Sequence, residues 1–496
     1  MMCARRSPFR DTNFPQLGGT ASRGGLVRSH FLLSLPSFCA GLAAALLLVV
    51  SPSIATAGAS YFAPAQESAS GTIVADANGV LHAAHTGYDA PNKGRVYYRA
   101  CAADCVKPEA WQTLELAFED PINVQIAVTP EGAPRLLVLN HTTGGGIAKG
   151  YDYASCDADC LDEDNWMITR VASLADRPLS GLFQYRIPER TFAVDASGQP
   201  HFIYVDANYF VEPDHYGAFY MTCLEDCGRA GNWIETDLAG HVPERYLTEQ
   251  FDQPALAVTP DGKLRLIASV YPFDEAGNQL EQGLYYLECD ANCIDRANWA
   301  RTRVIDTGAG SYPNPTWDIE VLDDGRPRAV LFAGAGVKDE GLSNQLIYMW
   351  CDAGCDADAN WYGNIRGWAK GGGESPDLEI NGRGQPRIAA LTEHGDLAIV
   401  SCETNCESDD SEWTANFVEE TSAAAADRPT AIPFHCDGEL WQGFMPRLAL
   451  RGDTPWFAYD LVVEARCLYK YIGDPDPRPT AIFHEIWRGS RLATID

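Results

Sequence analysis

One cysteine pattern occurs six times in this chain of 496 residues and constrains its fold more than any other feature. In each copy two cysteines stand four positions apart, and a tryptophan follows the second cysteine by six or seven positions. The first cysteines of successive copies lie 51 to 67 residues apart, which is typical of a repeat architecture. The pairs are Cys101/Cys105, Cys156/Cys160, Cys223/Cys227, Cys289/Cys293, Cys351/Cys355 and Cys402/Cys406.

Alternation and turn residues predict four strands and no helix within one period. In the second period, strands are expected at 126–128 and 134–139, joined by a turn that contains glycine. A third strand is expected at 151–155, followed by the cysteine turn and a fourth strand at 166–171. Four short strands per period predict an all-β fold, a β-propeller built from four-stranded blades.

The number of blades follows from the first hairpin, which recurs seven times and so exceeds the cysteine pairs by one. The seventh copy lacks the cysteine turn, so six blades plus a C-terminal cap is the alternative to seven blades. The hairpin glycines are Gly79, Gly132, Gly198, Gly262, Gly325, Gly384 and Gly452.

The cysteine pairs are expected to form structural disulfides, each joining the third and fourth strands of its blade. A redox pair would occur once or twice. Zinc would need two pairs that converge on one tetrahedron, whereas neighbouring blade rims splay apart and no histidine accompanies the pairs. The residue before each second cysteine is Asp, Asn or Gly, types that tolerate a left-handed turn. Each short loop contributes about 2 kcal/mol on the chain-entropy model.

Cys436 and Cys467 remain, and we expect them to form a seventh disulfide that joins the entry of the last blade to its third strand. The chain ends in an apparent fourth strand, Leu492 to Ile495, so no strand is expected for exchange between the two termini. The long disulfide would then compensate for the missing overlap.

The N-terminus indicates export. Five arginines precede a 13-residue apolar run that is too short for a membrane span of about 20 residues, and Ala55-Thr56-Ala57 is typical of a cleavage site. We therefore expect a signal peptide at 1–57, a short linker at 58–70 and the propeller at 71–496, with a single-pass anchor as the alternative. The mature chain is expected to be secreted, periplasmic or attached to the cell surface, and to lack a membrane span.

The charge of the chain excludes one class of partner. Without residues 1–57, 32 basic residues stand against 67 acidic ones, and such a field repels nucleic acid. We expect no cofactor and no metal site. Calcium at the alternating carboxylates Asp157 to Asp164 is the alternative, although the sixth-position glycine and the closing glutamate of an EF-hand are missing.

A third strand, a tight turn and a fourth strand led by tryptophan resemble the Asp-box hairpin of sialidases and related propellers, with a disulfide in place of the Asp-box. Tyr185-Arg186-Ile187-Pro188 is similar to the motif in which sialidases place an arginine that binds a carboxylate. Arg186 is expected to point into the central channel near the irregular face, because it starts the innermost strand of its blade. The other sialidase site residues cannot be assigned by motif, and no repeat matches the Asp-box itself.

Function is expected on the face opposite the cysteine turns, where longer and irregular loops gather. Aromatic, carboxylate and imidazole side chains on these loops suit a sugar or a peptide. We therefore expect a non-catalytic propeller that binds a glycan or peptide, with a sialidase-like glycoside hydrolase and a cell-envelope interaction scaffold as alternatives. The candidate ligand-binding residues are Arg186, His141, Tyr209, Asp214, His215 and Tyr271.

Overall fold

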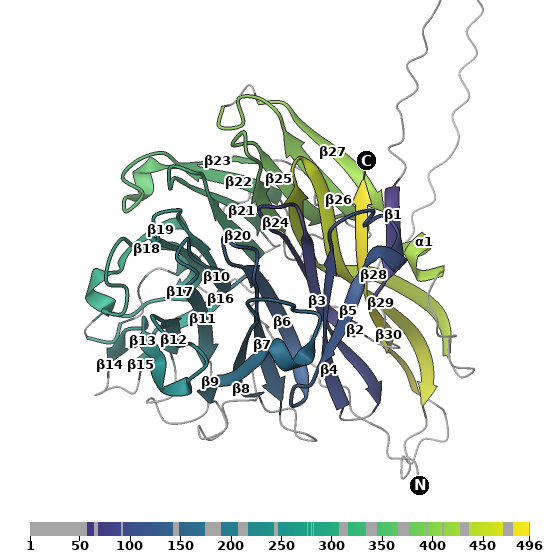
Figure 1. Ribbon diagram of the computed structural model, residues 1–496. Coiled ribbons are helices and arrows are strands. Elements are labelled where there is room, and N and C mark those ends of the chain that lie inside the picture. Colours follow the sequence, from purple (N-terminus) through teal and green to yellow (C-terminus); the bar gives the residue numbers. More distant parts are fainter. Residues whose placement is uncertain are drawn as a thin grey trace, which may run out of the picture. The chain divides into compact units, whose positions relative to one another are not determined.

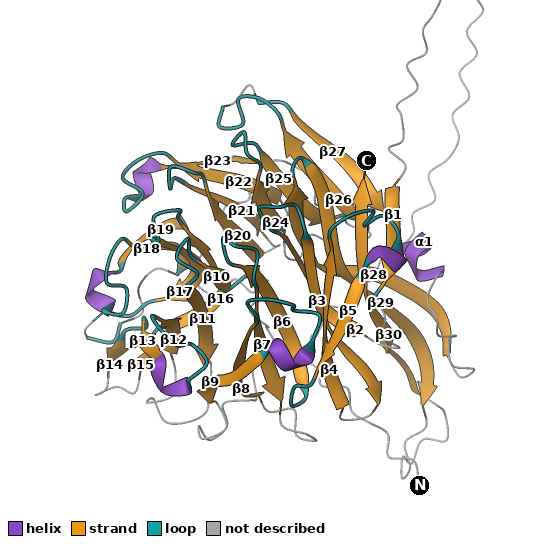
Figure 2. Cartoon of the chain, viewed as in Figure 1, coloured by secondary structure: helices purple, strands orange, loops and turns teal. Residues whose placement is uncertain are grey.

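Seven four-stranded antiparallel sheets form a ring in the computed structural model, which confirms the seven-bladed β-propeller (Figure 1, Figure 2). All described residues belong to the compact unit Ala55–Asp496. They are 57–63, 68–90, 93–141, 148–173, 190–206, 217–242, 247–274, 276–278, 280, 282–306, 316–333, 345–365, 376–392, 395–408, 411–426, 436–469 and 480–495.

Each blade is written here from its first strand to its fourth. Blade 1 holds β2 (Ser68–Ala75), β3 (Leu81–Ala90), β4 (Lys93–Cys101) and β5 (Gln112–Leu116), and blade 2 holds β6 (Pro121–Val128), β7 (Pro134–His141), β8 (Ala148–Ser155) and β9 (Met167–Ser173). Blade 3 holds β10 (Phe192–Val194), β11 (Pro200–Asp206), β12 (Gly217–Cys223) and β13 (Trp233–Asp237), and blade 4 holds β16 (Gln250–Val258), β17 (Leu264–Tyr271), β18 (Gly283–Cys289) and β19 (Ala300–Asp306).

Blade 5 holds β20 (Thr316–Val321), β21 (Pro327–Ala333), β22 (Gln345–Cys351) and β23 (Trp361–Ile365), and blade 6 holds β24 (Asp377–Ile380), β25 (Pro386–Leu391), β26 (Leu397–Cys402) and β27 (Trp413–Glu419). Blade 7 holds β28 (Cys436–Arg451), β29 (Thr454–Tyr469), β30 (Thr480–Ile495) and β1 (Ala57–Phe62). A short ribbon, β14 (His241–Val242) with β15 (Leu247–Thr248), and one helix, α1 (Thr421–Ala426), lie outside the blades.

The hairpin glycines explain why the first turn recurs. All seven have a φ angle between +64° and +85°, a left-handed conformation that costs glycine little and other residues more. The turn before each second cysteine has the same requirement. Asp104, Asp159, Asp226, Asn292, Gly354 and Asn405 all have a φ angle between +50° and +64°.

The cysteine turns form the six expected disulfides, with Cα atoms 5.6 to 5.8 Å apart. The expectation that each disulfide joins the third strand to the fourth is wrong. The first cysteine ends the third strand or follows it directly, whereas the second cysteine lies in the turn, before the fourth strand begins. Each disulfide therefore closes the turn itself. This correction applies to Cys105, Cys160, Cys227, Cys293, Cys355 and Cys406.

The reason for this difference is the length of the turn. In five blades a three-residue 3₁₀ turn separates the second cysteine from the fourth strand, a detail that the strand pattern did not predict. In these blades the indole N–H of the tryptophan donates to the carbonyl of the second cysteine at 2.9 to 3.0 Å. The tryptophan therefore fixes the turn as well as filling space. The bonds run from Trp111 to Cys105, Trp166 to Cys160, Trp233 to Cys227, Trp299 to Cys293 and Trp361 to Cys355.

The same indoles also join neighbouring blades. Trp166 contacts Tyr98 of the preceding blade with ring centroids 5.1 Å apart, and Trp233 contacts Tyr153 at 5.0 Å. Blades 4, 5 and 6 repeat this tryptophan–tyrosine contact with their predecessors at 4.9 to 5.5 Å. Each core cluster accordingly contains residues of adjacent blades.

The expectation that no strand is exchanged between the termini is wrong. The N-terminal strand β1 pairs antiparallel with β30, with Tyr61 opposite Leu492, and becomes the fourth strand of blade 7. The C-terminal strand β30 is therefore the third strand of that blade. The prediction failed because residues 57–62, which form the outer strand β1, lie within the expected signal peptide and linker.

The seventh disulfide is confirmed, but its place in the blade differs from the expectation. Cys436 and Cys467 are direct cross-strand partners on β28 and β29, with Cα atoms 3.9 Å apart. They join the first and second strands of blade 7, because β29 continues for 16 residues and carries Cys467 near its end. The pairing of β1 with β30 therefore closes the ring, and the disulfide fixes the first two strands of blade 7 to each other.

In the described part of the chain, no helix is long and apolar enough to cross a membrane.

Candidate functional site

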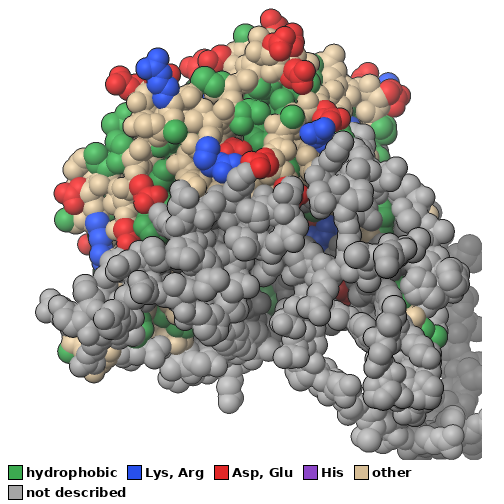
Figure 3. All heavy atoms as spheres, turned by 90° about the horizontal axis from the view of Figure 1, so that it is seen from below, with side chains coloured by type: hydrophobic (Ala, Val, Ile, Leu, Met, Phe, Trp, Pro, Cys, Tyr) green, Lys and Arg blue, Asp and Glu red, His purple; other side chains and the backbone are tan. Residues whose placement is uncertain are grey.

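The strand order places two kinds of turn at one end of the ring. The hairpin turn after each first strand and the cysteine turn after each third strand share this end, which we call the cysteine face. The connections between second and third strands and between blades lie at the other end, the irregular face. On the face drawn in Figure 3, the described surface shows acidic, basic and apolar side chains interspersed.

The inner edge of the ring is more distinctive than the surface. The third residue before the end of the first strand is equivalent by register in blades 1 to 6, and we call it the inner-ring position. In blade 7 the register places Arg447, the fourth residue before the end of β28, at this position. All seven side chains there are buried, and six are polar. They are Thr72, Gln125, Thr191, Ala255, Asp318, Asp377 and Arg447.

Several inner-ring side chains bond to the first strand of the following blade. Gln125 accepts from the backbone N–H of Thr191 at 2.9 Å. Asp318 accepts from the N–H of Leu378 at 2.8 Å, and Asp377 accepts from the N–H of Leu448. Because these bonds satisfy backbone donors between blades, the inner-ring position first serves assembly of the ring.

Arg190 crosses the centre from blade 3 to the opposite side of the ring. Its Nε lies 3.3 Å from Asp318 of blade 5 and also pairs with Asp377 of blade 6. Its Nη2 donates to the carbonyl of Pro446, at the start of blade 7, at 3.0 Å. Arg447 adds a second guanidinium, 3.8 Å from Asp377. The largely buried guanidinium of Arg190 therefore contacts blades 5, 6 and 7.

Two glutamates extend this group toward the cysteine face. Glu320 and Glu379 lie two residues after Asp318 and Asp377, on the same side of β20 and β24, because side chains alternate along a strand. The equivalent residues of the other five blades are small and apolar: Val74, Ala127, Ala193, Ala257 and Ala449. The Asp-x-Glu pair is thus specific to blades 5 and 6.

We call the six charged residues Arg190, Asp318, Glu320, Asp377, Glu379 and Arg447 the central cluster. Burial raises the pKa of Asp318 to about 7, although Arg190 opposes the shift. Burial and neighbouring carboxylates also raise the pKa of Glu320 and of Glu379 well above the usual range. The cluster therefore contains carboxyl groups that hold protons near neutral pH.

The two inner-ring aspartates lie close to each other. One oxygen of Asp318 and one of Asp377 both lie within 3.3 Å of the same nitrogen of Arg190, so these oxygens cannot be more than about 6.6 Å apart. Carboxyl pairs at such separations occur in glycoside hydrolases. Within the described ranges, no group of three or more His, Cys, Asp or Glu residues is arranged to hold a metal ion.

The residues expected from the sequence are not brought together by the described structure. Arg186, Tyr209, Asp214 and His215 lie outside the described residues. His141 is the last residue of β7. Tyr271 is the half-buried last residue of β17, opposite Gln250. These assignments remain predictions.

Sequence reasoning missed the central cluster, although a signal was present. Asp318-Ile319-Glu320 and Asp377-Leu378-Glu379 repeat one pattern at equivalent positions of two successive periods. Arg190 lies only four residues after Arg186, the arginine expected in the channel. A comparison of charged residues across the first strands would have found the two acidic pairs.

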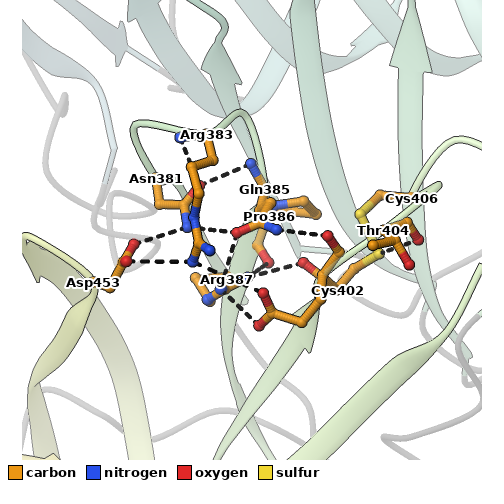
Figure 4. Close-up of polar contacts among 10 residues, drawn as sticks. Asn381, Arg383, Gln385, Pro386, Arg387, Cys402, Thr404, Cys406 and Asp453 are labelled. Atoms are coloured by element: carbon orange, nitrogen blue, oxygen red, sulfur yellow. Dashed lines mark hydrogen bonds and ion pairs between the residues drawn. A yellow bond between two sulfur atoms is a disulfide. The ribbon is translucent and has the colours of Figure 1, made fainter.

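A second set of buried charges lies at the cysteine face and is structural. The second residue of β25, Arg387, donates to the carbonyls of Pro386 and Cys402 at 3.0 and 2.9 Å, as Figure 4 shows. Its Nη2 also contacts Glu403, the residue after the first cysteine, at 2.8 Å. The same position and the same carboxylate recur as Arg135 with Asp157, Arg265 with Asp290, and Arg328 with Asp352.

Blades 1 and 3 have histidine at this position and no acid after the first cysteine. His82 bonds the hydroxyl of Tyr98 at 2.7 Å and lies 3.7 Å from Asp76 in the hairpin turn. His201 repeats this arrangement with Tyr220 and Asp195. Each arginine or histidine bonds within its own blade, and Arg328 also contacts Glu407 of blade 6 at 3.1 Å. Among the described residues, these contacts do not converge on one place as those of the inner ring do.

No protein-family model and no curated protein matches this chain. A solved protein of unknown function from Dyadobacter fermentans is 11% identical, with a TM-score of 0.41, over 88% of this chain and 99% of that chain. A PL25 ulvan lyase is 9% identical, with a TM-score of 0.41, over 86% and 95% of the two chains. An α-L-arabinanase from Penicillium chrysogenum is 13% identical, with a TM-score of 0.40, over 67% and 93%. Similarity at this level assigns neither a family nor a function.

Proposed function

We propose that this protein is an exported propeller that binds a glycan at the irregular-face mouth of its central channel. The observation that carries the proposal is the central cluster, in which charged side chains of blades 3, 5, 6 and 7 meet at one place. Convergent polar groups with perturbed pKa values at the centre of a ring mark a binding site by default.

The chemistry of the cluster favours a hydroxylated ligand. Guanidinium groups offer donors and carboxylates offer acceptors, so adjacent sugar hydroxyls can be held by both. Arg190 and Arg447 provide the donors, and Asp318 and Asp377 provide the acceptors nearest the start of the strands. A peptide could use the same groups, which makes it an outcome of the test.

The seven disulfides support the exported part of the proposal. Disulfides form and persist in oxidising compartments and are rare in the cytosol. All seven pairs join strands or turns of the blades.

Glycan-array screening followed by calorimetry on the exported chain tests the proposal. Asp318→Asn and Asp377→Asn keep the shape of each side chain while removing its charge. Each is expected to weaken glycan binding at least about tenfold, the loss of one charged hydrogen bond. Asp352→Asn is the matched control, because Asp352 is exposed on the cysteine face.

Three results would contradict glycan binding at this place. The array gives no hit, the central variants bind as tightly as the wild type, or Asp352→Asn weakens binding equally. Binding of peptides alone would replace the glycan by a peptide at the same site.

A glycoside hydrolase is the second candidate, favoured by the raised pKa of Asp318 next to Asp377. A carboxyl group that titrates near pH 7 suits a general acid. Release of reducing sugar from a bound glycan, abolished in Asp318→Asn, would support hydrolysis. Binding without turnover supports the non-catalytic function.

A further inference from the structure

A small cavity lies where the ring closes, between blade 1 and blade 7. It admits one particle about the size of a water molecule. Its lining includes Gly71, Ala83 and Arg99 of blade 1, and Ala458, Ser490 and Leu492 of blade 7. The space remains unfilled because Gly71, Ala83 and Ala458 have small side chains. A Cβ atom at Gly71 would lie only 3.3 Å from the Cβ of Ser490, so β2 of blade 1 and β30 of blade 7 already approach closely beside the cavity.

Two arginines line this cavity, Arg99 and Arg491, and Arg491 pairs with Glu419. Arg99 is the one without a carboxylate partner among the described residues. Its side chain is almost fully buried, and its Nε donates to the hydroxyl of Thr113 at 3.3 Å. Its guanidinium also lies over the rings of Tyr61 and Trp111, 5.9 and 5.1 Å from their centroids. Its Nη1 is buried and has no hydrogen-bond partner among the described residues.

Arg99 differs from every other buried arginine in the described part of the chain. There are seven, and six have a carboxylate oxygen within 4.0 Å. Arg99 has none among those residues. Burial lowers the pKa of Arg99, with only Tyr61 opposing the shift. A guanidinium stays charged at neutral pH, so this charge is buried without a compensating negative charge among the described residues.

A buried charge without a partner costs several kcal/mol unless another charge compensates it. We propose that the cavity binds one small monovalent anion, chloride under ordinary conditions, against Nη1 of Arg99. The size of the cavity excludes sulfate and phosphate, and a chloride ion is the abundant anion nearest in size to water. The anion then joins the first and last blades at the closure of the ring, independently of the central cluster.

Bromide is the direct probe of this site. Crystals of the exported chain grown in sodium bromide are expected to show an anomalous peak within hydrogen-bond distance of Nη1 of Arg99. A peak that is absent, with ordinary water density in its place, overturns the proposal. This measurement needs no variant and therefore does not depend on how substitutions fold.

Chloride-dependent stability is the second test. At constant ionic strength, replacing gluconate by chloride is expected to raise the midpoint of thermal unfolding of the wild type, because an ion that binds only the folded state stabilises it. Arg99→Gln is expected to lose this dependence. Arg95→Gln is the matched control, since Arg95 lies on the same strand, is partly exposed and pairs with Glu115.

Unchanged chloride dependence in Arg99→Gln, or none in the wild type, would each refute the anion site. Equal loss of the dependence in Arg95→Gln would show a general salt effect and would refute it as well.

Discussion

The cysteine face and the central cluster both bury charge, yet they do so in opposite ways. On the cysteine face each buried arginine pairs with the acid of its own cysteine turn, as Arg387 does with Glu403. Arg328 adds one contact to Glu407 of the next blade. In the centre, Arg190 alone contacts blades 5, 6 and 7. A contact within one blade can be copied with the repeat, whereas a contact across the ring cannot. Charged residues that depart from the repeat therefore indicate the candidate site.

The largest expected effect comes from the arginine that serves three blades. Arg190→Met should lower the free energy of unfolding by roughly 3–5 kcal/mol at pH 8, because it leaves buried carboxylates without their partner. The loss should be smaller at pH 5, where Asp318 is protonated. Urea denaturation at both pH values measures it.

Arg326→Met is the control from the cysteine face. Arg326 is exposed and pairs with Asp324 and Asp352, so its removal should cost no more than about 1 kcal/mol. Equal losses for the two variants would erase the distinction between the two regions.

Removing the disulfides compares blade 7 with a repeated blade. Replacing Cys436 and Cys467 by Ser opens a loop of 31 positions and should cost about 3.7 kcal/mol. Replacing Cys402 and Cys406, four positions apart, should cost about 2 kcal/mol. Denaturation without reductant checks the order. The reverse order would show that the Cys436–Cys467 disulfide stabilises the fold less than a short cysteine turn does.

Titration of the central cluster should lower the free energy of unfolding as the pH rises. The pKa of Asp318 is about 7 in the folded protein and lower when unfolded, so the folded state holds a proton that the unfolded state releases from about pH 4 upward. Between there and pH 7 the free energy of unfolding therefore decreases. Asp318→Asn should reduce this decrease by roughly 1–3 kcal/mol, as measured by urea denaturation at pH 5 and pH 8. An identical pH profile in the variant would refute the shift.

The smallest expected effect separates ligand binding from ring assembly. Glu320→Ala should change the free energy of unfolding by less than about 1 kcal/mol at pH 7, because alanine already occupies the equivalent position as Ala127, Ala193, Ala257 and Ala449. Thermal unfolding checks this. A loss above about 2 kcal/mol would assign Glu320 to assembly rather than to the site.

The repeat made much of the fold predictable. Blade number, strand order and the left-handed residues of both turns follow from patterns that recur within each period, such as Gly132 and Asp159. The positive φ angle of each turn favours these residue types, so every copy of the repeat shows them at the same positions. The pairing of Arg387 with Glu403 could also have been found this way, because four blades repeat it.

By itself, the sequence determined what is local and repeated: the strands, the glycine hairpins and the six disulfide turns. Only the tertiary structure decided that β1 completes blade 7, because a strand of six residues carries no sign of a partner more than 400 positions away. It also decided that Arg190 meets Asp318 and Asp377 at the centre of the ring. Closing a ring brings distant charges together by geometry, and no periodicity in the chain encodes which ones meet.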